Sequence, residues 1–262
     1  MITDTHVHLD DEKLRGELQE VIERATNVAV QRMICIATDA ASSNKSIEYA
    51  QKWNGVYASV GIHPNYGHEA QPDDWNQIVE LAGRPRVVAV GETGLDRHWN
   101  YTPFTTQQEF FRLHLALSRK TGLPLVIHCR EAETDMLEML TEDYNKHDLL
   151  HGVMHSFSGD QSFADACLRL GLYISFAGMV TYKNAHTLRE VAAMVPDDRI
   201  LVETDAPYLT PEPLRGKVKK NEPGHIVHTV ERLAVIRNTG LNAFAQQTSA
   251  NAESLFRFHK GK

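Results

Sequence analysis

Residues 3–9 are Thr3-Asp4-Thr5-His6-Val7-His8-Leu9, a segment that is typical of an extended β-strand. Side chains two residues apart on a strand point to the same face, so we expect His6 and His8 to lie side by side, with Asp4 one step deeper on that face. Two adjacent imidazoles can bind one metal ion. The chain contains 14 histidines, however, so this pair is weak evidence alone and depends on where other polar residues fall.

Strand-like apolar segments alternate with helical patterns along the chain. The predicted strands are Met1–Leu9, Arg32–Ala37, Val56–Gly61, Arg86–Gly91, Leu125–His128, Gly152–His155, Tyr173–Phe176 and Ile200–Thr204. A helix is expected after each strand, the first over about Leu14–Thr26, and an extra helix over about residues 243–258. Eight such pairs predict an α/β fold, a TIM (β/α)8 barrel with an extra C-terminal helix. An open, doubly wound sheet is the alternative, because pattern alone does not establish closure.

Length and composition agree with such a barrel. A chain of 262 residues matches the size of one barrel, so we predict a single domain over residues 1–262. The formal net charge of −7 offers no broad basic surface for duplex binding. It does not exclude a phosphate substrate, because bound metal cations can supply positive charge locally.

The cysteines and the apolar segments bear on location. Cys35, Cys129 and Cys167 are too few for a disulfide framework, which indicates a reducing compartment. No signal peptide is evident, and no apolar run approaches the roughly 18 residues needed to cross a bilayer. We therefore predict a cytoplasmic protein without a membrane partner, and the sequence indicates no obligate protein partner.

Six polar residues fall at the C-terminal ends of predicted strands. They are His6, His8, Glu92, His128, His155 and Asp205. In a barrel these ends share one face, which is the face that carries active sites. Four imidazoles and two carboxylates are too many for one tetrahedral ion but fit two divalent cations with a bridging carboxylate. We expect Glu92 to be the bridge, since it lies across the barrel from the first strand and one strand from His128.

The motifs around these residues resemble those of the TatD-type metal-dependent deoxyribonucleases, a branch of the amidohydrolase-like barrels. The resemblance runs essentially end to end and rests on Asp4-Thr5-His6-Val7-His8-Leu9, Gly61-Ile62-His63-Pro64, Gly91-Glu92-Thr93-Gly94-Leu95-Asp96, Ile127-His128-Cys129-Arg130-Glu131-Ala132, His155-Ser156-Phe157-Ser158-Gly159 and Glu203-Thr204-Asp205-Ala206-Pro207-Tyr208. It implies that one metal ion is held by His6, His8, Glu92 and Asp205. It implies a second ion held by Glu92, His128 and His155.

The ligand set and the resemblance together predict a deoxyribonuclease that hydrolyses phosphodiester bonds. Two divalent cations per chain, zinc, magnesium or manganese, would activate the attacking water. We expect Glu92 and Asp205 to be the catalytic residues, with Asp205 acting as both ligand and general base. The expected substrate is DNA, as an exonuclease on single-stranded ends, because a deep site at a barrel mouth admits a strand end more readily than an intact duplex.

Several nearby residues are candidates for substrate contacts. His63 could donate to a phosphate oxygen, and the planar fork of Arg130 suits a phosphate. Glu203 could orient a ligand or the water. Each has a plainer alternative, respectively a loop histidine, a solvent salt bridge and a buried structural pair. Asp96 is expected to brace the loop Gly91–Gly94 rather than to take part in chemistry.

Two other functions stay open at this stage. Related barrels use the same metals to hydrolyse a small carbon-centred ester, amide or lactone. A protein of another class could hold the metals and bind nucleic acid without catalysis. The complete ligand set, with its base, argues against that second alternative.

Overall fold

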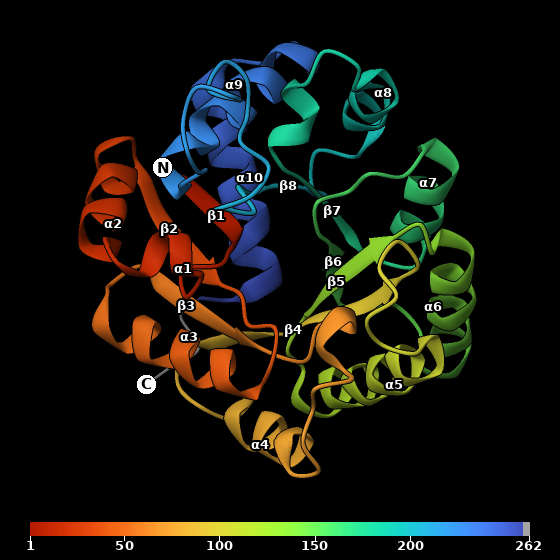
Figure 1. Ribbon diagram of the computed structural model, residues 1–262. Coiled ribbons are helices and arrows are strands. Elements are labelled where there is room, and N and C mark those ends of the chain that lie inside the picture. Colours follow the sequence, from red (N-terminus) through yellow and green to blue (C-terminus); the bar gives the residue numbers. More distant parts are fainter. Residues whose placement is uncertain (259–262) are drawn as a thin grey trace.

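The computed structural model describes residues 1–258. Within that range, eight strands form one sheet in the order β1-β2-β3-β4-β5-β6-β7-β8, with parallel neighbours (Figure 1). Their bounds are β1 (Ile2–Val7), β2 (Val30–Cys35), β3 (Val56–Val60), β4 (Val87–Asp96), β5 (Leu125–Arg130), β6 (Gly152–Met154), β7 (Tyr173–Phe176) and β8 (Ile200–Val202). The predicted TIM-barrel fold is confirmed.

The first and last strands meet and close the barrel. Val7 forms a parallel bridge with Ala206, and the His8 amide donates to the Ala206 carbonyl at 2.8 Å. One step away, the Asp205 amide donates to the His6 carbonyl at 2.9 Å. Backbone bonds between residues far apart in the chain therefore replace the free edges of an open sheet. The alternative of a doubly wound sheet is wrong.

The helices surround the barrel in Figure 1, apart from the last one, which fills one end of it. They are α1 (Glu12–Arg15), α2 (Leu18–Asn27), α3 (Ala40–Lys52), α4 (Asp74–Leu81), α5 (Phe104–Thr121), α6 (Glu133–His147), α7 (Gln161–Arg169), α8 (His186–Met194), α9 (Ile226–Ile236) and α10 (Leu241–Phe256), with short 3-10 turns η1 (Pro64–Tyr66), η2 (Gly178–Thr181) and η3 (Pro223–His225). The expected first helix is two helices, because Gly16 ends α1 and a new start follows. In residues 1–258, no helix combines the length and hydropathy required of a membrane span.

The inner face of the barrel changes from apolar to polar along β5, β6 and β8. Val126, Val153 and Leu201 belong to a buried cluster that also contains Leu255 and Phe256 of α10, so this helix fills one end of the barrel. Two residues further along the same strands, on the same face, come His128, His155 and Glu203. The strand period therefore puts an apolar floor beneath a polar site.

Strand β4 is longer than expected and contains Glu92 instead of ending before it. Its pairing with β5 shifts register between Val90 and Thr93. Gly91 and Gly94 flank Glu92 with φ of +135° and +146°, values that side-chain-bearing residues rarely adopt. A Cβ on Gly94 would lie 1.9 Å from the His128 carbonyl oxygen. The two glycines therefore allow a tightly packed irregular strand that turns Glu92 into the barrel.

Outside the barrel, His114 of α5 should make the stability of the fold sensitive to acid. It is fully buried, its Nδ1 lies 2.6 Å from the Phe110 carbonyl oxygen, and its Nε2 accepts from the Ile62 amide at 3.0 Å. Burial lowers the pKa of His114 from 6.5 to about 4. The unfolded chain therefore binds a proton that the folded chain excludes, and stability falls as pH drops from about 6.5 to about 4, by about 3 kcal/mol.

We expect His114→Gln to lose less of its free energy of unfolding over that pH interval than the wild type does. Urea unfolding curves, followed by circular dichroism at several pH values, would compare the two slopes. Glutamine keeps a donor and an acceptor but does not titrate, so identical acid slopes would contradict this account.

Candidate metal centre

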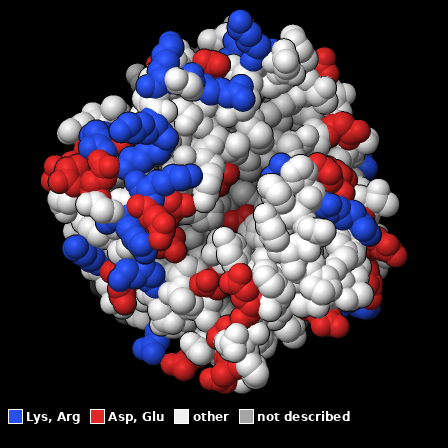
Figure 2. Space-filling model, viewed as in Figure 1, with Lys and Arg blue, Asp and Glu red and all other residues white. Residues whose placement is uncertain are grey.

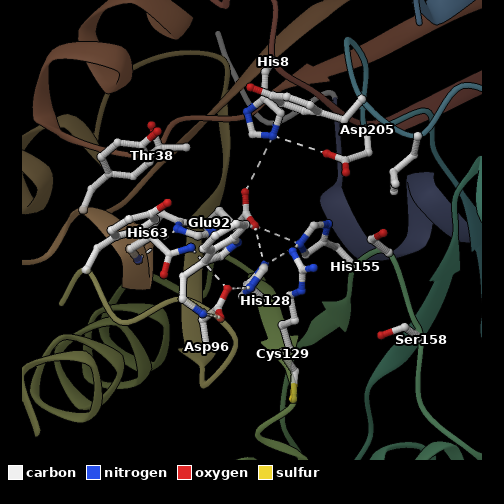
Figure 3. Close-up of a pocket in the computed structure, with 18 of the residues that line it drawn as sticks. His8, Thr38, His63, Glu92, Asp96, His128, Cys129, His155, Ser158 and Asp205 are labelled. Carbon is white, nitrogen blue, oxygen red and sulfur yellow. Dashed lines mark hydrogen bonds and ion pairs between the residues drawn. The ribbon is translucent and has the colours of Figure 1, made fainter. Parts of the chain in front are cut away.

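The six residues predicted at strand ends converge at one end of the barrel, and Figure 3 labels all of them except His6. His8, Glu92, His128, His155 and Asp205 line the inner part of a cavity of about 1100 Å³ that opens beside the β1–α1 and β4–α5 connections. Glu92 lies at the centre, buried to 2% exposure, with imidazoles on both sides. Its two carboxylate oxygens face two different groups of side chains.

The first group surrounds Glu92 Oε2. His6 Nε2 lies 3.4 Å and His8 Nε2 3.8 Å from this oxygen. The two imidazole nitrogens are 3.2 Å apart, and Asp205 Oδ1 lies 3.6 Å from the first and 3.4 Å from the second. Four donor atoms therefore enclose one point.

The second group surrounds Glu92 Oε1. His155 Nε2 lies 2.8 Å and His128 Nδ1 3.1 Å from this oxygen, and the two nitrogens are 3.3 Å apart. His63 Nε2 also lies 3.2 Å from Oε1. Glu92 thus presents one carboxylate oxygen to each group, as expected of a bridging carboxylate.

The spacing of these atoms fits metal ions. Tetrahedral coordination with bonds of about 2.0–2.1 Å places neighbouring ligand atoms about 3.3–3.4 Å apart. The separations within the first group run from 3.2 to 3.8 Å, and those among Glu92, His128 and His155 from 2.8 to 3.3 Å. Mixed imidazole and carboxylate donors suit zinc and manganese, and the carboxylates also suit magnesium. The residues therefore fit divalent cations in both groups.

The electrostatics of the cluster keep its carboxylates ionised. Burial alone would raise the pKa of Glu92, but the charges of His155, His63 and His6 outweigh it and hold that pKa well below 4.5. Burial likewise opposes ionisation of Asp205, yet the hydrogen bond from His8 holds its pKa below the usual value. Ionised carboxylates are the form that binds a cation.

Asp96 positions His128 by contacting the ring nitrogen that faces away from Glu92. Its Oδ2 lies 2.9 Å from His128 Nε2, while Nδ1 of the same ring faces Glu92. Asp96 Oδ1 accepts from the amides of His98 and Trp99, so it also braces the chain, although beyond Gly94 rather than between Gly91 and Gly94. The contact with His128 is a function that the sequence analysis missed. Glu92 and Asp96 share the same strand parity, which is the one signal for this contact, but the predicted strand ends at Gly91, the first of two glycines in an irregular segment.

Glu203 holds the ring of His155. Its Oε1 accepts from the Ser156 amide at 2.7 Å and lies 3.3 Å from His155 Nδ1, which leaves Nε2 free to face Glu92. The geometry thus favours an orienting role for this residue. His6, His155 and Glu203 also bring one donor atom each within 4.8 Å of one another.

His63 is buried beside Glu92 and does not lie at the exposed rim of the cavity. Its Nδ1 accepts from the Asn65 amide at 3.1 Å, which assigns the ring proton of the neutral imidazole to Nε2. That Nε2 faces Glu92 Oε1, so His63 donates toward the carboxylate. His63, Glu92 and His128 are close enough to share an ion, but a protonated Nε2 favours the donor role over that of a ligand.

The outer part of the cavity is aromatic and carries one arginine. Trp99 and Tyr101 stack with ring centroids 5.4 Å apart and planes 11° apart, and they are 41% and 55% exposed. The Arg130 guanidinium lies 5.7 Å from the Trp99 ring centroid. Arg130 therefore lines the mouth of the cavity and not the cluster around Glu92.

Hydrogen bonds fix the segment that carries Asp205. Thr204 donates its amide and its hydroxyl to the buried carboxylate of Asp4, at 2.9 and 2.6 Å. The buried Asn221 side chain donates to the carbonyls of Thr204 and Tyr208. Asp205 itself has φ of +54°, in the left-handed region that Asp tolerates better than most residues. These contacts direct its carboxylate toward His8.

Comparison with known proteins agrees with the fold and with this cluster. A family model described as "TatD related DNase" matches residues 3–257. The uncharacterized metal-dependent hydrolase YabD of Bacillus subtilis is 38% identical over 259 residues, which cover 99% of this chain and 100% of that protein. The 3'-5' ssDNA/RNA exonuclease TatD of Citrobacter rodentium is 34% identical, covering 97% of each chain. The crystal structure of YjjV, a TatD homologue from Escherichia coli K12, superposes with a TM-score of 0.91 at 29% identity, covering 98% of each chain. This chain therefore belongs to the TatD family of metal-dependent hydrolases.

Proposed function

We propose that this protein is a divalent-metal-dependent deoxyribonuclease that removes nucleotides from single-stranded DNA ends, and that it holds two metal ions per chain. The observation that carries the proposal is the position of Glu92, which presents one oxygen to each of two donor groups. His6, His8 and Asp205 complete the first metal site. His128 and His155 complete the second.

Bound cations in this arrangement would polarise a phosphodiester and lower the pKa of a water molecule toward about 7. Asp205 is the proposed general base, because its ionised carboxylate lies at the open edge of the first group and lines the cavity. His63 carries a proton on Nε2 that faces a Glu92 oxygen, and when a bound metal ion takes that oxygen, this N–H would be available to donate to a phosphate oxygen or the water instead. Glu203 keeps His155 oriented.

The shape of the cavity supports a nucleic acid substrate. Its volume of about 1100 Å³ exceeds that of a typical pocket for a small ligand. Tyr66, Trp99, Tyr101 and Tyr208 line it with exposed rings, on which unpaired bases can stack with little sequence preference. The exonuclease named in Citrobacter rodentium, at 34% identity, supports the same substrate class.

The direct test uses end-labelled single-stranded DNA. Protein stripped of metal and then given magnesium, manganese or zinc should shorten the strand stepwise, whereas protein kept with a chelator should leave it intact. Circular duplex DNA should be cut more slowly than the open single strand. Turnover of a lactone and ester panel, with DNA and RNA left intact, would refute the assignment in favour of carbon-centred esters.

Asp96→Asn should weaken metal binding without removing a ligand. The contact with the Asp96 carboxylate fixes the orientation of His128, and losing such a partner typically costs about 10–100-fold in metal affinity. Competition titration with a fluorescent chelator would measure the change. Asp135→Asn is the matched control, because Asp135 pairs with Arg97 on the surface nearby. Equal affinities for the two variants would show that the Asp96 contact does not support the site.

A further inference from the structure

A second cavity of about 650 Å³ adjoins the cavity of about 1100 Å³ that contains the candidate metal centre, here called the reaction cavity. The two share Ser158 and Met179 in their linings, so they are adjacent parts of one depression. The second cavity, here called the side groove, lies between η2, the start of α8 and the segment after β8. Its lining includes Tyr182, Lys183, Glu212 and Arg215.

The walls of the side groove are fixed before any ligand binds. The Glu212 amide donates to Thr181 Oγ1 at 2.8 Å and joins the segment after β8 to η2. Arg189 of α8 donates to the carbonyls of Tyr182 at 2.7 Å and Lys183 at 3.1 Å. At Gly178 a Cβ would lie 2.0 Å from the Leu209 carbonyl oxygen, so the two walls meet in backbone contact. A preformed groove binds a ligand with little ordering cost.

The two cavities differ in charge. Nine carboxylate residues line the reaction cavity, among them Asp10, Glu69 and Glu131, against the single cation Arg130. The side groove has two cations, Lys183 and Arg215, against one carboxylate. Figure 2 shows red side chains deep in the central hollow and below it, blue ones along the top, and blue and red ones together on the left of this face. A polyanion that extends out of the reaction cavity is therefore attracted on the side of the groove and repelled by the acidic part of the mouth.

Arg215 is held in place by an aromatic ring. Its guanidinium carbon lies 3.9 Å from the centroid of Tyr182, a cation–π contact. Among residues 1–258, no salt bridge of 4 Å or less is formed by Arg215 or Lys183, so neither charge is neutralised by a carboxylate. A guanidinium that is positioned but not paired can donate its planar N–H groups to a phosphate.

We propose that the side groove binds the part of a single-stranded nucleic acid that adjoins the scissile nucleotide. Arg215 and Lys183 bind a backbone phosphate there, and Tyr182 and Met179 offer apolar surface to a base. This inference rests on the proposed nuclease function, because it extends the substrate of that site beyond the nucleotide under attack. It assigns strand-length preference to the side groove rather than to the metal centre.

The test compares a thymidine dinucleotide with a thymidine octanucleotide as substrates of the metal-loaded enzyme. The preference for length is the kcat/KM for the octanucleotide divided by that for the dinucleotide. In Arg215→Ala this ratio should fall about tenfold, mainly because KM for the octanucleotide rises. A loss of about tenfold is what one charge-assisted hydrogen bond is expected to contribute. Tyr182→Leu should reduce the same ratio less. Lys217→Ala removes an equal charge from the same segment but outside the groove, and should leave the ratio unchanged.

Binding of a fluorescein-labelled phosphorothioate octanucleotide, which resists hydrolysis, separates the two proposals. Weaker binding by Arg215→Ala than by Lys217→Ala supports the groove even if the wild type hydrolyses no nucleic acid, an outcome that would refute only the nuclease. Hydrolysis by the wild type with equal binding and equal ratios in both variants would refute only the groove. Failure of the wild type both to bind and to cleave would refute both.

Discussion

Glu92→Gln is expected to lose both of the metal ions proposed for this site and at least about 10³-fold in the rate of hydrolysis. The carboxylate of Glu92 faces His6 and His8 with one oxygen and His128 and His155 with the other. An amide offers only one good metal-binding oxygen, and its nitrogen carries two protons that repel a cation. Weakening two sites that each contribute several kcal/mol to catalysis corresponds to a rate loss of this size.

Metal content after gel filtration and single-turnover hydrolysis of single-stranded DNA would measure the two losses. The matched control is Glu131→Gln, because Glu131 lines the same cavity but pairs with His98 at its exposed edge. That control should keep both ions and most of the activity. A Glu92→Gln protein that retained two ions and a rate within tenfold of the wild type would show that Glu92 is not the bridge.

Gly94→Ala is expected to destabilise the fold by at least about 3 kcal/mol and to displace His128. The new Cβ would lie 1.9 Å from the His128 carbonyl oxygen, and φ at residue 94 is +146°. Backbone atoms of two paired strands cannot separate without breaking the β4–β5 ladder. Urea unfolding would give the loss of stability, and metal titration would report the displaced ligand.

Gly122→Ala separates steric overlap from backbone strain. Gly122 also has positive φ, +72°, but no atom lies within 4 Å of its hypothetical Cβ. Alanine there should cost only about 1 kcal/mol, the price of a left-handed residue alone. Equal losses in the two variants would mean that close approach to His128 is not what requires glycine at position 94.

The convergence of the site was predictable because two simple rules produce it. Strand alternation places His6 with His8, and parallel strands of a barrel present their C-terminal ends on one face. Those rules depend only on local pattern and on chain order. The predicted bounds of β7, Tyr173–Phe176, agree with the structure, since this short segment lies between the breaks that Gly171 and Gly178 provide.

Contacts that depend on irregular backbone were not predictable in this way. The Gly91–Gly94 irregularity extends β4 to Asp96, and only that extension brings Asp96 to His128. The pairing of Tyr182 with Arg215 joins two connections that no sequence period relates. Likewise, the position of Asn221 depends on how the long segment after β8 folds back on Thr204.

Because α10 closes one end of the barrel, it limits the route by which substrate can enter and product can leave. Leu255 and Phe256 pack against the inner residues of the strands, so this end of the barrel is filled and the reaction cavity opens at the other end. A strand cannot thread through such a molecule. In the proposed exonuclease, each released mononucleotide must therefore leave through the same opening of the cavity that admits the substrate. The product must therefore leave before the remaining strand can advance. Binding in the side groove, as proposed above, would hold that strand between the two steps.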